Sequence, residues 1–157
     1  MLYVMLCLFS AAIVVVDQLV KLRVVETIAL GAQTPGIPGL FHFTHVQNTG
    51  ASFSMFSGYG WLFVVVLVVF IALLPVLIRK KILSRPVELW CLFAILGGGV
   101  GNAIDRILHG YVVDMIEVEF MQFAVFNVAD IFITCGCIAL ALVILFDKPK
   151  KEEAHEA

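Results

Sequence analysis

The sequence contains few charged residues. Only 14% of its 157 residues are Asp, Glu, Lys or Arg, whereas 62% are hydrophobic, and the mean hydropathy is +1.06. An average soluble domain carries about 25% charged residues, so this chain has too little polar material to cover a water-facing surface. Intrinsic disorder is excluded because it requires low hydrophobicity and high net charge. Composition and length together indicate an integral membrane protein with a single domain over residues 1–157.

Positive charge is scarce as well. Ten Lys and Arg residues stand against twelve Asp and Glu residues, which gives a net charge of −2 and leaves no basic stripe. A nucleic-acid partner is therefore not expected. The sequence also contains no glycine-rich phosphate-binding loop and no serine nucleophile motif, so two common classes of enzyme site are not expected either.

Charge is almost absent from four long segments. A helix needs about 20 mostly apolar residues to cross a hydrocarbon core about 30 Å thick. The sequence therefore predicts an all-α membrane fold with spans at approximately 2–22, 59–78, 87–108 and 128–146. Barrel strands are excluded because these runs are too long and do not alternate. The first span lacks the basic start and the small-residue cleavage site of a signal peptide, so we expect it to be retained.

Lys and Arg are divided unequally between the two sides of the predicted bundle. The link at 79–86 holds four and the tail at 148–157 holds three, whereas the opposite side has only three in total. The positive-inside rule places both termini, the charged tail and Ser84 in the cytoplasm. It places Thr34 and Glu119 outside.

Polar residues gather at the outer ends of the predicted spans and in the short link between the third and fourth. They are Asp17, Asn102, Asp105, Arg106, Asp114, Asn127 and Asp130. Ionisable residues within a membrane are costly and usually mark function. We therefore expect a functional site near the outer face.

Several of these residues also have a simpler structural interpretation. Asn127 and Asp130 have the spacing of a helix cap, in which Asp130 favours the positive end of the helix dipole. Asp17 and Lys21 have the spacing of an i,i+4 ion pair.

The third span offers two further structural interpretations. As an alternative to a role in the site, Asp105 and Arg106 could form an interfacial ion pair. Gly97 and Gly101 lie four residues apart, which is typical of close helix packing. Such packing would bring the following turns of the helix against a neighbouring helix.

A metal site is not expected. His42 and His45 lie three apart in an alternating segment, where they would face opposite sides of a strand. Cys135 and Cys137 are separated by about 200° around a helix and can share neither a metal nor a disulfide. The remaining two cysteines, Cys7 and Cys91, are isolated in apolar spans and are interpreted as packing residues.

The two outer connections contain alternating apolar and polar residues. This pattern occurs around 41–46 in the long connection and around 116–120 in the second connection. Together they predict a small sheet outside the membrane.

Two carboxylates without a metal suit the chemistry of an aspartic protease. If Asp114 and Asp130 lie close together, one keeps a proton and the other activates water. The alternative is a small proton-coupled transporter that uses Asp17 or Asp130, and a structural assembly subunit is a third interpretation. Transporters place binding residues near the midplane and often contain repeats, whereas this cluster is off-centre and repeats are absent.

Five separated motifs resemble those of bacterial lipoprotein signal peptidase (signal peptidase II). They run in order along the chain: Asp17 with Lys21, Asn48-Thr49-Gly50-Ala51-Ser52-Phe53, Gly98-Gly99-Val100-Gly101-Asn102-Ala103-Ile104-Asp105-Arg106, Gly110-Tyr111-Val112-Val113-Asp114, and Phe126-Asn127-Val128-Ala129-Asp130.

The resemblance implies a membrane aspartic peptidase with four helices and a small β-cradle formed by the outer loops. It cuts the signal peptide from diacylglyceryl-modified prolipoproteins before the lipidated Cys, needs no cofactor, contacts membrane lipids and binds globomycin-type peptide inhibitors. Asp114 and Asp130 match the catalytic pair. The residues that match supporting positions are Asp17, Lys21, Asn48, Gly98, Asn102, Asp105, Arg106, Asn127 and Ala129.

Overall fold

Four long helices form the membrane part of the protein. The computed structural model describes residues 1–50 and 58–146, so the predicted tail and residues 51–53 of the second motif lie outside the described residues. The helices are α1 (Leu2–Thr27), α2 (Gly60–Arg79), α3 (Pro86–His109) and α4 (Val128–Phe146). Each is long and apolar enough to cross a membrane, which confirms the four predicted spans.

The first helix extends five residues beyond its predicted end. Charged residues ended the predicted span at 22, but Arg23 and Glu26 continue the helix as an exposed i,i+3 pair with N and O atoms 3.6 Å apart. Thr27 Oγ1 donates a hydrogen bond to the carbonyl of Arg23 at 2.7 Å. Charge therefore marks the end of the apolar segment, and the helix itself ends later.

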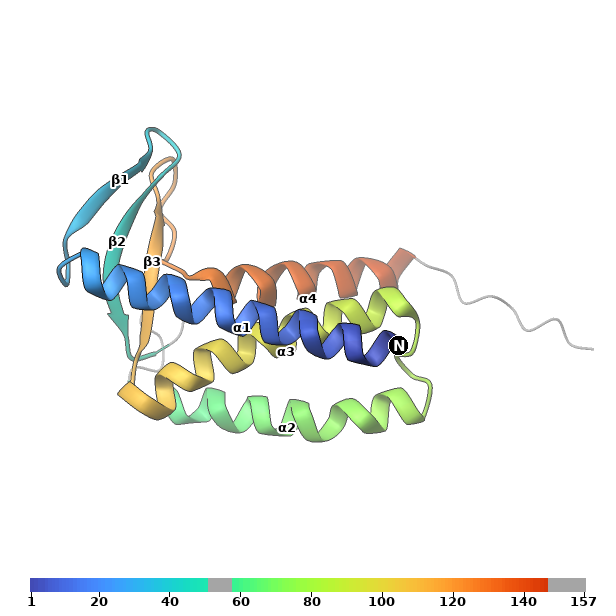
Figure 1. Cartoon of the computed structure of the whole chain (residues 1–157). Coiled ribbons are helices and arrows are strands. Elements are labelled where there is room, and N and C mark those ends of the chain that lie inside the picture. Colours follow the sequence, from blue (N-terminus) through green and yellow to red (C-terminus); the bar gives the residue numbers. More distant parts are fainter. Residues whose placement is uncertain (51–57, 147–157) are drawn as a thin grey trace, which may run out of the picture.

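Helix α3 is the central element of the bundle and packs mainly against α4 and α1 (Figure 1). Its glycines permit this close packing. A Cβ atom at Gly97 would lie 2.8 Å from the carbonyl oxygen of Ser10 in α1, and one at Gly98 would clash with the carbonyl oxygen of Ala129 in α4. The prediction that these small residues serve close helix packing is confirmed.

A three-stranded antiparallel sheet lies at the end of the bundle opposite Met1 (Figure 1). Its strands β1 (Gln33–Ile37), β2 (Phe41–Asn48) and β3 (Val112–Val118) are hydrogen-bonded in that order. This confirms the predicted sheet. The side chains of Val113 and Met115 on β3 pack against Val24 and Ile28 at the end of α1, which fixes the sheet to the bundle.

Candidate active site

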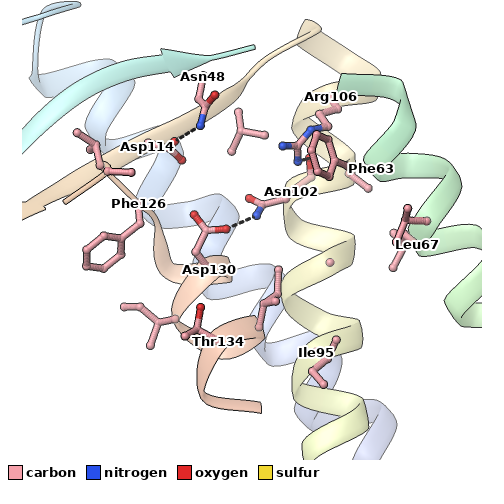
Figure 2. A pocket seen from close by; sticks show the side chains of 18 of the residues that line it. Asn48, Phe63, Leu67, Ile95, Asn102, Arg106, Asp114, Phe126, Asp130 and Thr134 are labelled. Carbon is pink, nitrogen blue, oxygen red and sulfur yellow. Dashed lines mark hydrogen bonds between the residues drawn. The ribbon is translucent and has the colours of Figure 1, made fainter. Parts of the chain in front are cut away.

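The two candidate catalytic acids come from different elements at the sheet end of the bundle. Asp114 is the third residue of β3, and Asp130 lies in the first turn of α4. Both side chains line one cavity of about 640 Å³ (Figure 2). The structure therefore brings together the two carboxylates that the sequence selected.

Asn127 connects the two acids. Its side-chain Nδ2 donates to Oδ1 of Asp114 at 2.6 Å, and its backbone N–H donates to Oδ2 of Asp130 at 3.2 Å. The backbone N–H of Asp130 in turn donates to Oδ1 of Asn127 at 2.9 Å. Asn127 and Asp130 thus form a reciprocal helix cap, as their spacing predicted. The side-chain amide of Asn127 also binds the other acid, Asp114.

The second oxygen of each acid accepts a hydrogen bond from a different asparagine, which comes from another element. Asn48, at the end of β2, donates from Nδ2 to Oδ2 of Asp114 at 2.8 Å, and Asn102 on α3 donates from Nδ2 to Oδ1 of Asp130 at 2.7 Å (Figure 2). All four carboxylate oxygens therefore accept at least one hydrogen bond. This holds both acids in fixed orientations.

The orientation of the Asn102 amide is set from α1. Lys21 Nζ donates to Oδ1 of Asn102 at 2.9 Å, and Asn127 Nδ2 donates to the same oxygen at 3.1 Å. Because two donors face the amide oxygen, the NH₂ group must point the other way, toward Asp130.

Lys21 is buried and makes two ion pairs. Its Nζ lies 2.8 Å from Oδ2 of Asp17 and 3.0 Å from Oδ2 of Asp105. With the bond to Asn102, all three of its N–H donors have an acceptor. The predicted i,i+4 pair of Asp17 and Lys21 is confirmed. Both side chains are buried, and the further contacts of Lys21 with Asp105 and Asn102 compensate the cost of burying the charges.

Asp17 joins α1 to the start of α4. Its Oδ1 accepts the backbone N–H of Ala129 at 2.9 Å, next to Asp130 in the chain. Ala129 is fully buried, and its carbonyl oxygen packs against Gly98. Gly98 and Ala129 thus set the spacing of α3 and α4, whereas Asp17 holds the first turn of α4.

The alternative interpretation of Asp105 and Arg106 as an ion pair with each other is wrong. Consecutive residues of a helix point about 100° apart, so Asp105 faces Lys21 on α1 while Arg106 faces α2. The Arg106 guanidinium lies over the ring of Phe63, 4.7 Å from its centroid (Figure 2). Arg106 Nη2 donates to the carbonyl of Gly50 at 2.9 Å, which ties the chain after β2 to the rim of the cavity.

The environment of Asp114 shifts its protonation. Burial raises the pKa of this carboxyl to about 6 from its ordinary 3.8. Hydrogen bonds from Asn48 and Asn127 lower the pKa, whereas the nearby charge of Asp130 raises it further. A carboxyl with a pKa of about 6 can hold and give up a proton near neutral pH, as a general acid must.

The rest of the cavity is largely apolar. One side of α2 contributes residues at 63, 66, 67 and 70, which together extend over about 10 Å of helix. The opposite wall comes from α3 and α4, and the roof from the segment before α4. The main apolar lining residues are Phe63, Val66, Leu67, Phe70, Ile95, Ala103, Phe123, Val125, Phe126, Ile131 and Ile133.

The structure also adds residues that the sequence analysis did not select. Gln18 donates to two carboxylates of the network, and Phe63 stacks on Arg106. Gln18 was detectable in principle as a polar residue within an apolar span. Phe63 carries no such signal, because its role depends on the packing of α2 against α3.

The histidines have separate partners. His42 Nε2 lies 2.8 Å from Glu117 Oε2, whereas His45 Nδ1 donates to the carbonyl of Ile28 at 2.9 Å. All four cysteines are free. Over residues 1–50 and 58–146, no group of three or more His, Cys, Asp or Glu residues is arranged to hold a metal.

A family model described as Signal peptidase (SPase) II matches residues 9–146 of the chain. The chain belongs to the signal peptidase II family. The lipoprotein signal peptidase of Trichormus variabilis is 47% identical over 135 residues, which are 85% of this chain and 85% of that protein. The lipoprotein signal peptidase of Streptococcus pyogenes serotype M2 is 42% identical over 135 residues, which are 84% of this chain and 87% of that protein.

Two solved structures described as bacterial membrane enzymes, determined by the in meso method, share the fold. The one at 2.3 Å resolution has a TM-score of 0.84 and 27% identity, and the match covers 98% of this chain and 93% of that chain. The one at 1.9 Å resolution has a TM-score of 0.78 and 28% identity, with 92% and 93% covered. The resemblance inferred from the motifs is confirmed, and this member of the signal peptidase II family is a multi-pass membrane peptidase.

Proposed function

We propose that the protein removes the signal peptide from diacylglyceryl-modified prolipoproteins by an aspartic mechanism, cutting on the N-terminal side of the lipidated Cys. The observation that carries this proposal is the position of Asp114 and Asp130 on one apolar cavity, with Asn127 bonded to both. The names of the curated relatives support the same substrate class.

The two acids have different roles in this mechanism. Asp130 lies at the N-terminus of α4, where the helix dipole stabilises a carboxylate, and it acts as the base. It takes a proton from water while the oxygen attacks the peptide carbonyl carbon. Asp114, with its raised pKa, donates its proton to the carbonyl oxygen. When the C–N bond breaks, Asp130 returns a proton to the leaving nitrogen, and Asp114 recovers its own from the tetrahedral intermediate.

The supporting residues hold this geometry. Asn48, Asn102 and Asn127 donate to the carboxylate oxygens, whereas the buried Asp17, Lys21 and Asp105 fix the amide that faces Asp130. Arg106 lines the cavity. In this proposal its guanidinium binds oxygen atoms of the peptide.

The shape of the cavity suits an apolar substrate segment. Its walls continue along α2, α3 and α4 below the two acids, inside the membrane part of the protein (Figure 2). A signal peptide or an acyl chain buries apolar surface there, at about 25 cal/mol for each Å² removed from contact with water. In this proposal globomycin-type peptide inhibitors occupy the same cavity, and membrane lipids contact the protein.

We place the sheet end of the bundle outside the cell. Arg79, Lys80, Lys81 and Arg85 gather at the opposite end, in and around the link between α2 and α3. The acids then lie near the outer face of the cytoplasmic membrane, where a lipid anchor holds the bond to be cut. Both termini are cytoplasmic in this arrangement.

The direct test uses purified protein and a diacylglyceryl-modified prolipoprotein in lipid vesicles. Mass spectrometry should find a mature product that begins at the lipidated Cys, and the same prolipoprotein without the lipid should remain uncut. No product, or a product cut at another bond, would contradict the proposal.

A further inference from the structure

Gln18 lies at the centre of a group of acceptors that the mechanism above does not explain. It is half-buried on α1, and its Nε2 lies 2.9 Å from Oδ1 of Asp105, 3.1 Å from the carbonyl oxygen of Gly101 and 3.3 Å from Oδ2 of Asp17. A glutamine inside an apolar span is costly unless its polar atoms find partners. This one joins α1 to α3 at the level of the buried charges.

Charge explains why a neutral donor is needed there. Two carboxylates, Asp17 and Asp105, share the single ammonium group of Lys21, so the buried group carries an excess of negative charge. The Gln18 amide supplies N–H donors to both acids without adding a charge. A hydrogen bond to a buried charged group is stronger than one between neutral groups.

Asp105 in turn holds the strand that carries Asp114. Its Oδ2 accepts the backbone N–H of Val113 at 3.1 Å, directly before Asp114 in the chain. The backbone N–H of Met115, directly after Asp114, donates to the carbonyl of Phe126 at 3.0 Å. Because β3 is the edge strand of the sheet, these two bonds fix its open edge on either side of the acid.

We propose that Gln18 is a positioning residue for Asp114, which acts by holding the Asp105 carboxylate so that it anchors β3. Gln18 and Lys21 face the two oxygens of Asp105 from α1 and fix the orientation of its carboxylate. In that orientation Oδ2 of Asp105 accepts the hydrogen bond from the Val113 N–H. The inference rests on the proposed role of Asp114 in catalysis. It assigns Gln18 to the placement of the acid, and neither Gln18 nor Asp105 lines the cavity.

The test compares Gln18→Met with the parent in single-turnover cleavage of a diacylglyceryl-modified prolipopeptide, with enzyme in excess. At a saturating excess of enzyme, the single-turnover rate constant does not depend on the fraction of protein that is active, so loss of folded enzyme does not imitate a positioning effect. Gln33→Met is the matched control, because it removes an exposed glutamine that donates to Glu117 at 3.4 Å on the far part of the sheet.

We expect Gln18→Met to lower the rate constant by about tenfold or more, since a misplacement of about 1 Å can cost about 100-fold. The Kd of an uncleaved lipopeptide should stay within about threefold of the parent, because the cavity is unchanged, and Gln33→Met should match the parent throughout. A parental rate constant for Gln18→Met, whether or not its thermal stability falls, would overturn the inference.

A second variant covers the case in which Gln18→Met does not fold. Asp105→Asn keeps the volume but places an NH₂ group against one of the donors that face the carboxylate, so its rate constant should also fall while the Kd is kept. A parental rate constant there would likewise overturn the inference. Failure of the proposed function has a different result, because the parent itself would then leave the lipopeptide uncut.

Discussion

The side-chain amide of Asn127 donates a hydrogen bond to Oδ1 of Asp114 across 2.6 Å. Asn127 also caps the helix that carries Asp130, so a single residue sets the position of one acid relative to the other. Helix capping and the assembly of the site are therefore one structural feature. A change that moves the start of α4 therefore moves Asp130 together with the Asn127 amide that donates to Asp114.

The first prediction concerns pH. Asp114 must be protonated to act as the general acid, and burial raises the pKa of this group to about 6. We therefore expect kcat/KM to fall as the pH rises through about 6, and kcat to fall at a higher pH, because bound substrate removes more water from the carboxyl. Initial rates in vesicles between pH 4.5 and 8 check this, using about half-unit steps.

The ionisation of Asp114 should also change the stability of the folded protein. Measuring that change is the control for the assignment of the pH dependence to Asp114. The folded protein binds this proton more tightly than the unfolded chain, so ionising Asp114 costs stability as the pH rises from about 4 to about 6, and the cost is complete above that. Asp114→Asn cannot ionise. The melting temperature of Asp114→Asn relative to the parent should therefore rise between these two pH values. If the difference in melting temperature does not change with pH, the fall of kcat/KM near pH 6 comes from another group.

The second prediction compares two glycines on α3. A Cβ atom at Gly101 would lie 2.7 Å from Oδ2 of Asp17, a carboxylate already held by Lys21 at Oδ2 and by the Ala129 N–H at Oδ1. Among the described residues, one at Gly99 would meet only the flexible end of Leu67, at 2.9 Å. Gly101→Ala should cost about 1–3 kcal/mol more than Gly99→Ala. The gain in helix propensity is the same at both positions and cancels. Thermal unfolding in detergent measures the difference, and equal melting temperatures would refute the rigid placement of Asp17.

The third prediction is the topology. In intact cells, on a background without native cysteines, an impermeant thiol reagent should label Thr34→Cys and spare Ser84→Cys. Both side chains are exposed, so burial does not decide the result. The basic link that contains Ser84 is expected in the cytoplasm by the positive-inside rule, which sets the orientation of the bundle. Labelling of position 84 with none at 34 would invert the orientation of the whole bundle.

The fourth prediction is that neither a metal nor a thiol takes part. Asparagine N–H donors face the oxygens of both acids, and a cation would have to displace them. Chelator treatment and replacement of all four cysteines by Ala should leave the rate within about threefold of the parent, as is usual when the reacting groups are untouched. Activity lost with a chelator and restored by zinc would contradict the two-carboxylate mechanism.

Much of the fold could be predicted because charge and alternation are local signals. The four spans and the sheet follow from runs of apolar residues and from period-two patterns. The proximity of Asp114 and Asp130 could be taken only from the family resemblance. It depends on β3 pairing with β2 and on α4 packing against the glycines of α3.

Partners that lie far apart in the chain are equally hard to predict. Adjacency in the sequence suggests Arg106 as an ion-pair partner of Asp105, but its partners are Lys21 and Gln18 on α1, more than 80 residues away in the chain. Such partners are chosen by helix packing, and a single sequence contains no local trace of it. Gln18 gives a weaker signal in the sequence, because it is uncharged and shares its span with the charged Asp17 and Lys21.

Single-turnover cleavage by Asp114→Asn and Asp130→Asn, measured beside binding of a globomycin-type inhibitor, tests the central claim most directly. Each substitution keeps the size of the side chain but removes a group that must exchange protons, so cleavage should be lost while inhibitor binding remains. Asp17→Asn, outside the cavity, should cost less in rate and more in thermal stability. Cleavage at nearly the parental rate by either Asp114→Asn or Asp130→Asn would show that the residue is not half of a catalytic pair.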